Sequence, residues 1–281
     1  MKTKDGVELF VRDWPLPAGA RRRGSALIVH GLGEHSGRYA HVAAALNGIG
    51  VTVRGYDHRG FGQSGGPKAT IPSLNALVED AKLVFDAFAA EAKAAGDSAP
   101  PFLIGHSMGG TIAARAVTGG WIRPRGLVLS SPGLKAKIPL FKRLLIAVGN
   151  RLTPNLVQPH GLPLDKISHD PRVLAEAAAD PLCHDKATPR LVAFILDAGK
   201  CALRDAAKLD VPTLLLVAGE DRLVDPEGSR EFAAALPPGR GTLHWYAPLW
   251  HEVFNEREPE RTRVLGDLQG WIASRLDAKR A

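Results

Sequence analysis

The residues Gly105-His106-Ser107-Met108-Gly109 carry the clearest structural signal in this chain. An apolar run at 101–105 leads into them, and residues 111–115 after them favour a helix. A Gly-x-Ser-x-Gly motif between a strand and a helix is typical of a sharp turn that lifts the serine hydroxyl clear of a sheet. Glycines on both sides avoid the collisions that a Cβ atom would make in so tight a turn. Ser107 is therefore the candidate nucleophile.

Away from this motif, short apolar runs alternate with segments of helical pattern. The alternation predicts the α/β class, with a mostly parallel sheet covered by helices on both faces. An N-terminal strand pair at 7–14 and six further runs predict an eight-stranded sheet. The six runs span residues 26–30, 51–56, 101–105, 126–130, 213–217 and 242–246. Helices are expected at 39–47, 74–95, 108–117, 226–235 and 259–276.

The alternation fails between residues 130 and 213, where prolines and helical patterning replace the strand signals. With 281 residues and 45% hydrophobic content, the chain can form one α/β core with one insertion. We expect a core made of 1–132 and 205–281, with 133–204 inserted as a helical cap. Within it, 139–152 combines apolar residues at helical spacing with basic neighbours. This segment is either a packed cap helix or a lid that holds acyl chains and touches a lipid surface.

The composition limits the classes of partner. The formal net charge is +7, but apart from Arg21-Arg22-Arg23 the basic residues are dispersed, without the patterns of nucleic-acid binding. Transient contact with an anionic membrane surface through the cap is a weaker alternative. The charged N-terminus and the lack of any run of ~18 apolar residues predict a soluble cytoplasmic protein, peripheral at membranes if it meets them at all. Cys183 and Cys201 lack the spacing of a zinc site or a disulfide framework, so we expect reduced thiols and no metal.

A serine hydroxyl is a poor nucleophile, so it needs an imidazole base that a carboxylate orients. After a motif of this kind, the acid and then the histidine follow the serine in the chain. Asp221 comes just after the run at 213–217 and is the expected acid. Asp225 and Glu220 stay as alternatives, although Asp225 can instead cap the next helix. His251 follows the last expected strand by a short loop and is the expected base.

The other histidines near or after Ser107 have simpler explanations. His106 precedes the nucleophile, and its side chain should leave the backbone in another direction, so we expect a structural role. His244 lies within an expected strand. Three more fall in the expected cap, namely His160, His169 and His184.

The tetrahedral intermediate of acyl transfer carries an oxyanion that two backbone N–H groups stabilise. One donor belongs to the residue after the nucleophile, which is Met108 here. The other comes from a loop after an early strand, and His30-Gly31-Leu32-Gly33 provides such a loop. Its glycines let the backbone come close to a substrate, so Leu32 is the expected second donor.

Taken together, these motifs resemble the monoglyceride lipase and lysophospholipase-like branch of the α/β-hydrolases, a serine aminopeptidase-type family. The resemblance covers nearly the whole chain. It implies the α/β-hydrolase fold, no cofactor, and Ser107, Asp221 and His251 as catalytic triad, with Leu32 and Met108 as oxyanion hole. It also implies hydrolysis of a monoacylglycerol or a similar lipid ester with a single acyl chain. The stretches that carry it are 30–39, 57–65, 105–110, 221–225 and His251-Glu252.

Several finer assignments follow from the resemblance and stay open. Glu34, His35, Arg38 and Val224 are candidate substrate contacts, with the alternative that Arg38 pairs with a carboxylate and holds its loop. Residues 57–60 are expected to pin a neighbouring turn. A lysophospholipase, a general carboxylesterase and a thioesterase are alternative activities. A ligand-binding protein without catalysis is the alternative of another class.

Overall fold

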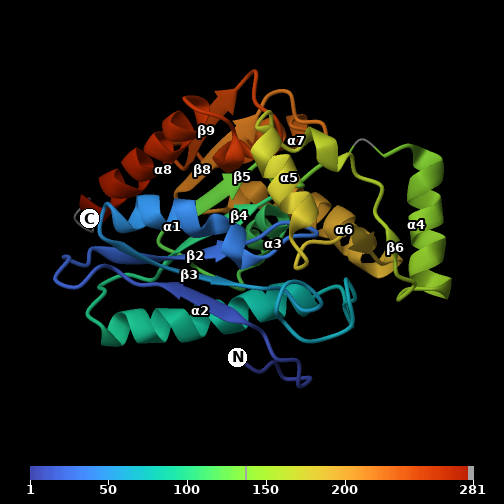
Figure 1. The fold of residues 1–281 in the computed structure, drawn as a ribbon, viewed down its shortest axis with the longest axis horizontal. Helices are drawn as coiled ribbons and strands as arrows, with labels where there is room; N and C mark the ends of the chain where they lie inside the picture. The colour runs from blue at the N-terminus through green and yellow to red at the C-terminus, as the bar shows by residue number, and fades with distance from the viewer. Residues whose placement is uncertain (137, 278–281) are drawn as a thin grey trace.

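Seven strands form the central sheet in the order β1-β3-β2-β4-β5-β8-β9, and all but the edge strand β1 run parallel (Figure 1). The computed structural model describes residues 1–136 and 138–277. Within them, the predicted core strands are present within about two residues of their expected bounds. The strands are β1 (Val11–Trp14), β2 (Gly24–Val29), β3 (Val51–Tyr56), β4 (Phe102–His106), β5 (Leu127–Ser130), β8 (Thr213–Ala218) and β9 (Gly241–Tyr246).

The predicted eighth strand is wrong, because the N-terminal segment forms one sheet strand and not two. Ahead of β1, the chain makes only an isolated bridge between Lys2 and Glu8. The Phe10 N–H donates to Ser64 Oγ at 2.8 Å, and the carbonyl of Glu8 accepts from the N–H of Gly65 at 2.8 Å. The loop that contains Ser64 and Gly65 thus satisfies backbone groups that a further strand would have used.

Residues on the strands alternate between two apolar layers. Leu27 and Val29 of β2 belong to the larger cluster, and Ala26 and Ile28 belong to the second. The helices α2 (Ala76–Ala94), α3 (Met108–Thr118) and α7 (Glu227–Ala235) supply the first layer. The helices α1 (Ala40–Asn47) and α8 (Glu260–Asp277) supply the second. Both faces of the sheet are therefore covered, as the continuous apolar runs predicted.

A long connection between β5 and β8 carries the residues expected to form the cap. It contains α4 (Leu140–Leu152), β6 (Gln158–Pro159), α5 (Pro171–Ala179), β7 (Lys186–Ala187) and α6 (Pro189–Asp205). Helix α6 buries Leu191 and Phe194 in the same layer as α2 and α3. Helix α4 packs against α6 and lies at the right edge of the molecule in Figure 1. No helix in the described part of the chain combines the length and the apolarity needed to cross a membrane.

The carboxyl ends of the parallel strands bring the candidate residues to one edge of the sheet. Leu32 follows β2, Ser107 follows β4, Asp221 follows β8 and His251 follows β9. The strands run in the same direction, so these four loops open on the same side.

Candidate active site

Ser107 occupies a strained turn between β4 and α3. Its φ of 53° and ψ of −119° lie where residues with a side chain are rare. A Cβ at Gly109 would lie 2.1 Å from the carbonyl oxygen of Val29, and one at Gly105 would lie 2.4 Å from the carbonyl oxygen of Gly109. The Ser107 N–H donates to the carbonyl of Ser130 at 3.0 Å. Packing on both sides therefore requires the two glycines and holds the serine in its unusual conformation.

Ser107, His251 and Asp221 form one hydrogen-bonded chain. Ser107 Oγ lies 2.8 Å from His251 Nε2, and His251 Nδ1 lies 2.7 Å from Asp221 Oδ2. His251 and Asp221 are both buried. The second carboxylate oxygen of Asp221 accepts the backbone N–H groups of Leu223 at 2.8 Å and Val224 at 3.0 Å. The carboxylate is thus fixed on both oxygens, and the imidazole is held toward the serine.

The electrostatics of this pair favour its charged forms. Burial opposes ionisation of Asp221, but His251 and the hydrogen bonds from imidazole and backbone outweigh it and lower the pKa of the carboxyl. Burial likewise disfavours a protonated His251, yet the charge and hydrogen bond of Asp221 raise the pKa of the imidazole above 6.5. The imidazole can therefore take up a proton from the serine without becoming an unpaired buried charge.

The competing acids and histidines have other partners. Asp225 Oδ1 accepts the Glu227 N–H at 3.3 Å, at the start of α7. Glu220 pairs with Arg222 at 3.6 Å. His106 Nδ1 lies 3.1 Å from Ser130 Oγ, and burial lowers its pKa to about 4. Tertiary packing, not loop sequence, separates Asp221 from the neighbouring acids.

The backbone N–H groups of Leu32 and Met108 stand beside the serine. Within residues 1–136 and 138–277, neither N–H donates to another protein group. Met108 is the first residue of α3, and the N–H groups of the first turn of a helix have no partner within the helix. Leu32 and Ser107 line the same cavity. Two main-chain donors without a protein partner therefore belong to residues near the candidate nucleophile, one directly after it in the chain and one in the lining of its cavity.

Arg38 links the loop after β2 to the loop that holds His251. It donates to Glu34 at 2.7 Å and makes two hydrogen bonds to Glu252 at 2.8 and 2.7 Å. Glu34 also accepts from the Gly31 N–H and the Tyr39 hydroxyl, each at 2.6 Å. Of the two roles considered for Arg38, these contacts favour holding the loop. Sequence reasoning gave Glu252 no role, although it directly follows His251.

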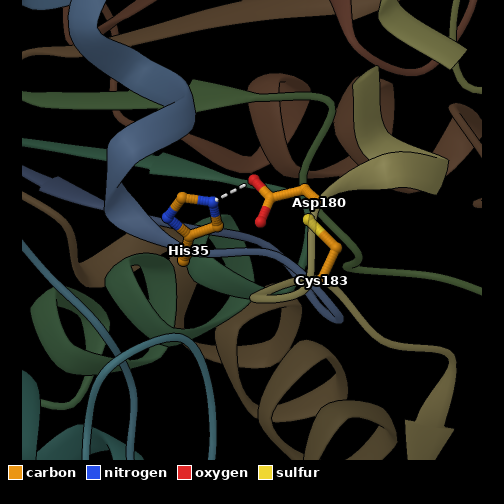
Figure 2. A group of neighbouring side chains, drawn as sticks. All are labelled: His35, Asp180 and Cys183. Atoms are coloured by element: carbon orange, nitrogen blue, oxygen red, sulfur yellow. Dashed lines mark hydrogen bonds and ion pairs between the residues drawn. The ribbon is translucent and has the colours of Figure 1, made fainter. Parts of the chain in front are cut away.

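His35 contacts Asp180, in the connection between β5 and β8, and is not among the residues that line the cavity. Its Nδ1 accepts the Gly37 N–H at 3.2 Å, so Nε2 carries the proton that is donated to Asp180 at 2.8 Å. Figure 2 shows this contact with Cys183 beside it. The ligand atoms of His35, Asp180 and Cys183 lie within 4.8 Å of one another. Burial raises the pKa of Cys183 to about 12, so a metal ion held through Nε2 of His35 would need both a new imidazole tautomer and loss of a thiol proton.

A cavity of about 450 Å³ is lined by Ser107, by loops at the carboxyl ends of the strands and by residues of the connection between β5 and β8. Leu32 and Leu223 contribute from the core, whereas the expected contact Val224 offers its N–H to Asp221 and is not part of the lining. No sequence motif indicated which apolar residues of the connection between β5 and β8 line the cavity. They are Leu162, Leu164, Ile167, Leu174, Ala177 and Ala178.

Side chains of residues 57–60 hold the neighbouring turn through hydrogen bonds and an ion pair, as expected. Asp57 Oδ1 accepts the Ser36 N–H at 2.8 Å and the Ser36 hydroxyl at 2.6 Å, and Oδ2 accepts the Gln63 N–H at 2.8 Å. Arg59 makes a buried pair with Asp80 at 2.6 Å. The contacts of Asp57 with Ser36 tie the turn after β3 to the start of the 3-10 helix at Ser36–Tyr39, and the pair of Arg59 with Asp80 ties it to α2.

Comparison with known proteins adds to this geometry. The family model described as serine aminopeptidase matches residues 20–258. The chain belongs to the serine aminopeptidase family. The family resemblance read from the motifs is therefore confirmed.

Several relatives of this chain are named as lipases. It is 34% identical to a monoacylglycerol lipase of Mycolicibacterium smegmatis, over 90% of this chain and 89% of the relative. It is 31% identical to the human monoglyceride lipase, over 96% of this chain and 88% of the relative. The crystal structure of Paleococcus ferrophilus monoacylglycerol lipase superposes with a TM-score of 0.85 at 32% identity, covering 95% of this chain and 99% of that one. The α/β-hydrolase fold is thus confirmed, and these similarities support hydrolysis of carboxylic esters.

Proposed function

We propose that this protein is a monoacylglycerol lipase, a serine hydrolase that releases a fatty acid and glycerol through an acyl-enzyme. The single observation that carries the proposal is the chain from Ser107 through His251 to Asp221, with contacts of 2.8 and 2.7 Å, at the floor of a cavity with a largely aliphatic cap. The named lipase relatives support the same substrate class.

In the proposed reaction, His251 Nε2 takes the proton of Ser107 as Oγ attacks the ester carbonyl carbon. The carbonyl oxygen becomes an oxyanion that accepts the N–H groups of Leu32 and Met108. The imidazolium then protonates the leaving alcohol oxygen, and the acyl-enzyme remains. A water molecule, deprotonated by the same imidazole, attacks the carbonyl carbon of the acyl-enzyme. The imidazolium then protonates Ser107 Oγ as the bond between Oγ and the acyl carbon breaks and the fatty acid is released. Asp221 stabilises the imidazolium in both halves.

The charges around the cavity support a substrate that carries no free ammonium group. An aminopeptidase needs a carboxylate to receive the ammonium of its substrate. The two buried acids of the lining, Glu34 and Glu252, already pair with Arg38 at 2.7 Å each. A cavity in which these charges are compensated suits glycerol, whose hydroxyl groups are uncharged, better than a free amino terminus.

The outer face of α4 supports membrane contact as part of the same proposal. Phe141, Leu144 and Leu145 are each more than 60% exposed. The helix carries Lys142, Arg143 and Arg151 and has no acidic residue. An amphipathic helix with this charge fits the surface of an anionic bilayer, where a monoacylglycerol is dissolved. The cytoplasmic location stays a prediction.

The test of the activity is Ser107→Ala, assayed with monoacylglycerols of graded acyl length, lysophosphatidylcholine and a p-nitrophenyl ester. We expect hydrolysis of monoacylglycerols by the wild type and loss of it in the variant, with loss of labelling by a fluorophosphonate. Ser274→Ala, at an exposed position of α8, is the matched control and should behave as wild type. Activity in Ser107→Ala would contradict the mechanism. A preference for lysophosphatidylcholine would make the protein a lysophospholipase. A wild type that shows no turnover and no labelling would be a binding protein without catalysis.

A further inference from the structure

We infer that His30 is a positioning residue that orients the oxyanion donor of Leu32 by holding the carbonyl of the Gly31–Leu32 peptide group. The inference rests on the proposed function, because it assigns a task within that reaction. It starts from a pair of fully buried histidines, His30 and His58, that the mechanism does not otherwise use.

Two hydrogen bonds fix the tautomer of His30. Its Nδ1 lies 2.8 Å from the carbonyl oxygen of Gly31, which can only accept, so Nδ1 carries the proton. Its Nε2 lies 2.9 Å from the backbone N–H of His58, which can only donate, so Nε2 is bare. Both contacts require the same neutral form of the ring. The His58 ring donates from Nε2 to the carbonyl of His30 at 3.0 Å and closes the arrangement.

The geometry of the peptide bond passes this constraint to Leu32. The carbonyl of Gly31 and the N–H of Leu32 belong to one planar group and point in opposite directions when the bond is trans. Because the carbonyl is held against the buried ring of His30, the N–H points away from that ring. We infer that it points toward the cavity, whose lining includes Leu32 and Ser107. The preceding N–H, that of Gly31, is held separately by Glu34 at 2.6 Å.

The buried site keeps the ring in this form. Burial lowers the pKa of His30 to about 3, so the imidazole stays neutral wherever the proposed base His251 can act. A second ring proton would face the N–H of His58. A donor that needs no reorientation during the reaction stabilises an oxyanion most effectively.

Two substitutions separate the two contacts of His30. His30→Asn places an amide N–H near the position of Nδ1, so it can still donate to Gly31, but it cannot reach the N–H of His58. His30→Gln places an amide oxygen near the position of Nε2, so it can accept from His58 but leaves the carbonyl of Gly31 without its donor. His244→Gln, at a half-exposed ring on β9, is the control.

Removing an oxyanion donor outright lowers kcat by about 10²–10³, so misorienting one should lower it by about tenfold. We expect that loss in His30→Gln, equally in kcat and kcat/KM with KM unchanged, because the contact matters in the transition state. His30→Asn should lose less than about threefold in kcat although its thermal stability falls as well. Loss of stability with kcat unchanged in His30→Gln, or a tenfold loss in kcat in His30→Asn, would overturn the inference.

If either variant fails to fold, a measurement on the wild-type protein still tests the inference. Nitrogen NMR of the His30 ring should show a protonated Nδ1 and a bare Nε2, and the Nδ1 proton should shift when a phosphonate forms its tetrahedral adduct on Ser107. A protonated Nε2, or a signal unmoved by the adduct, would contradict the inference. Ser107→Ala is measured in parallel. Full activity in that variant refutes the proposed function, whereas an inactive Ser107→Ala beside a fully active His30→Gln refutes only the role of His30.

Discussion

Arg38 and Glu252 meet through two parallel hydrogen bonds of 2.8 and 2.7 Å, although they are 214 positions apart in the chain. The same guanidinium donates to Glu34, which in turn accepts the N–H of Gly31. Because Glu252 directly follows His251, one side chain ties the loop of the proposed oxyanion donor to the loop of the proposed base. Charge-assisted pairs of this geometry are strong and directional.

Removing this link should destabilise the protein. Arg38→Gln leaves two buried carboxylates without their cation, which costs about 3–5 kcal/mol in comparable buried pairs. The free energy of unfolding in urea measures the loss. Arg240→Gln, at an exposed position, is the matched control and should stay within about 0.5 kcal/mol of wild type. A loss below about 1 kcal/mol in Arg38→Gln would show that water or local rearrangement compensates the two acids.

The role of Asp221 as the acid of the proposed triad is tested by replacing it with asparagine. Asp221→Asn keeps the shape of the side chain but removes the charge that stabilises the imidazolium, and the equivalent exchange in a serine protease lowers kcat by about 10⁴. We expect a loss of that order with a monoacylglycerol substrate. Asp225→Asn is the control, since an amide oxygen can still accept the Glu227 N–H. A larger loss in Asp225→Asn than in Asp221→Asn would reassign the acid.

Activity should fall on acidification with an inflection above pH 6.5. His251 must be neutral to act as base, and Asp221 raises the pKa of the imidazole above that value. Protonation therefore removes the active form at a higher pH than for an ordinary histidine. The pH profile of kcat/KM measures the inflection in the free enzyme. In Asp221→Asn it should move to lower pH, and an unmoved inflection would assign it to another group.

The turn that carries Ser107 should not tolerate a methyl group at Gly109. A Cβ there would lie 2.1 Å from the carbonyl oxygen of Val29, so Gly109→Ala should cost at least about 3 kcal/mol or prevent folding. Gly266→Ala is the contrasting variant, because a Cβ within α8 meets nothing within 4 Å. It should gain about 1 kcal/mol from helix propensity. Equal thermal midpoints for the two variants would contradict this account.

The exposed face of α4 should decide binding to lipid vesicles. Replacing Leu144 and Leu145 with serine removes apolar surface that a bilayer would bury, so binding to vesicles rich in phosphatidylglycerol should weaken at least about tenfold. Added salt should also weaken wild-type binding, because the helix is basic. Leu243→Ser, on an exposed leucine of β9, is the control. Cosedimentation that is the same for all three proteins would exclude this face as the contact.

Local sequence was enough for features that depend on short stretches of backbone. The turn at Ser107 needs glycines at fixed positions, since a Cβ there meets backbone atoms, so its motif can be read directly. Continuous apolar runs likewise indicated strands buried on both faces. The N-terminal pair failed as a prediction, because Glu8 and Phe10 are bonded to the loop at 64–65 and no local pattern shows which partner a strand edge will find.

Sequence by itself therefore determined the α/β class and the candidate nucleophile, because these follow from periodicity and backbone sterics. The order of the nucleophile's partners followed from what its motif is typical of. Only tertiary structure decided which acid reaches His251, where Arg38 places its hydrogen bonds, and which cap residues line the cavity. The reason is physical: a buried polar group must find a partner, but the partner is whatever packing brings within about 3 Å, often from hundreds of residues away. His30 shows both limits, since its motif was visible in the sequence and its bond to the carbonyl of Gly31 was not.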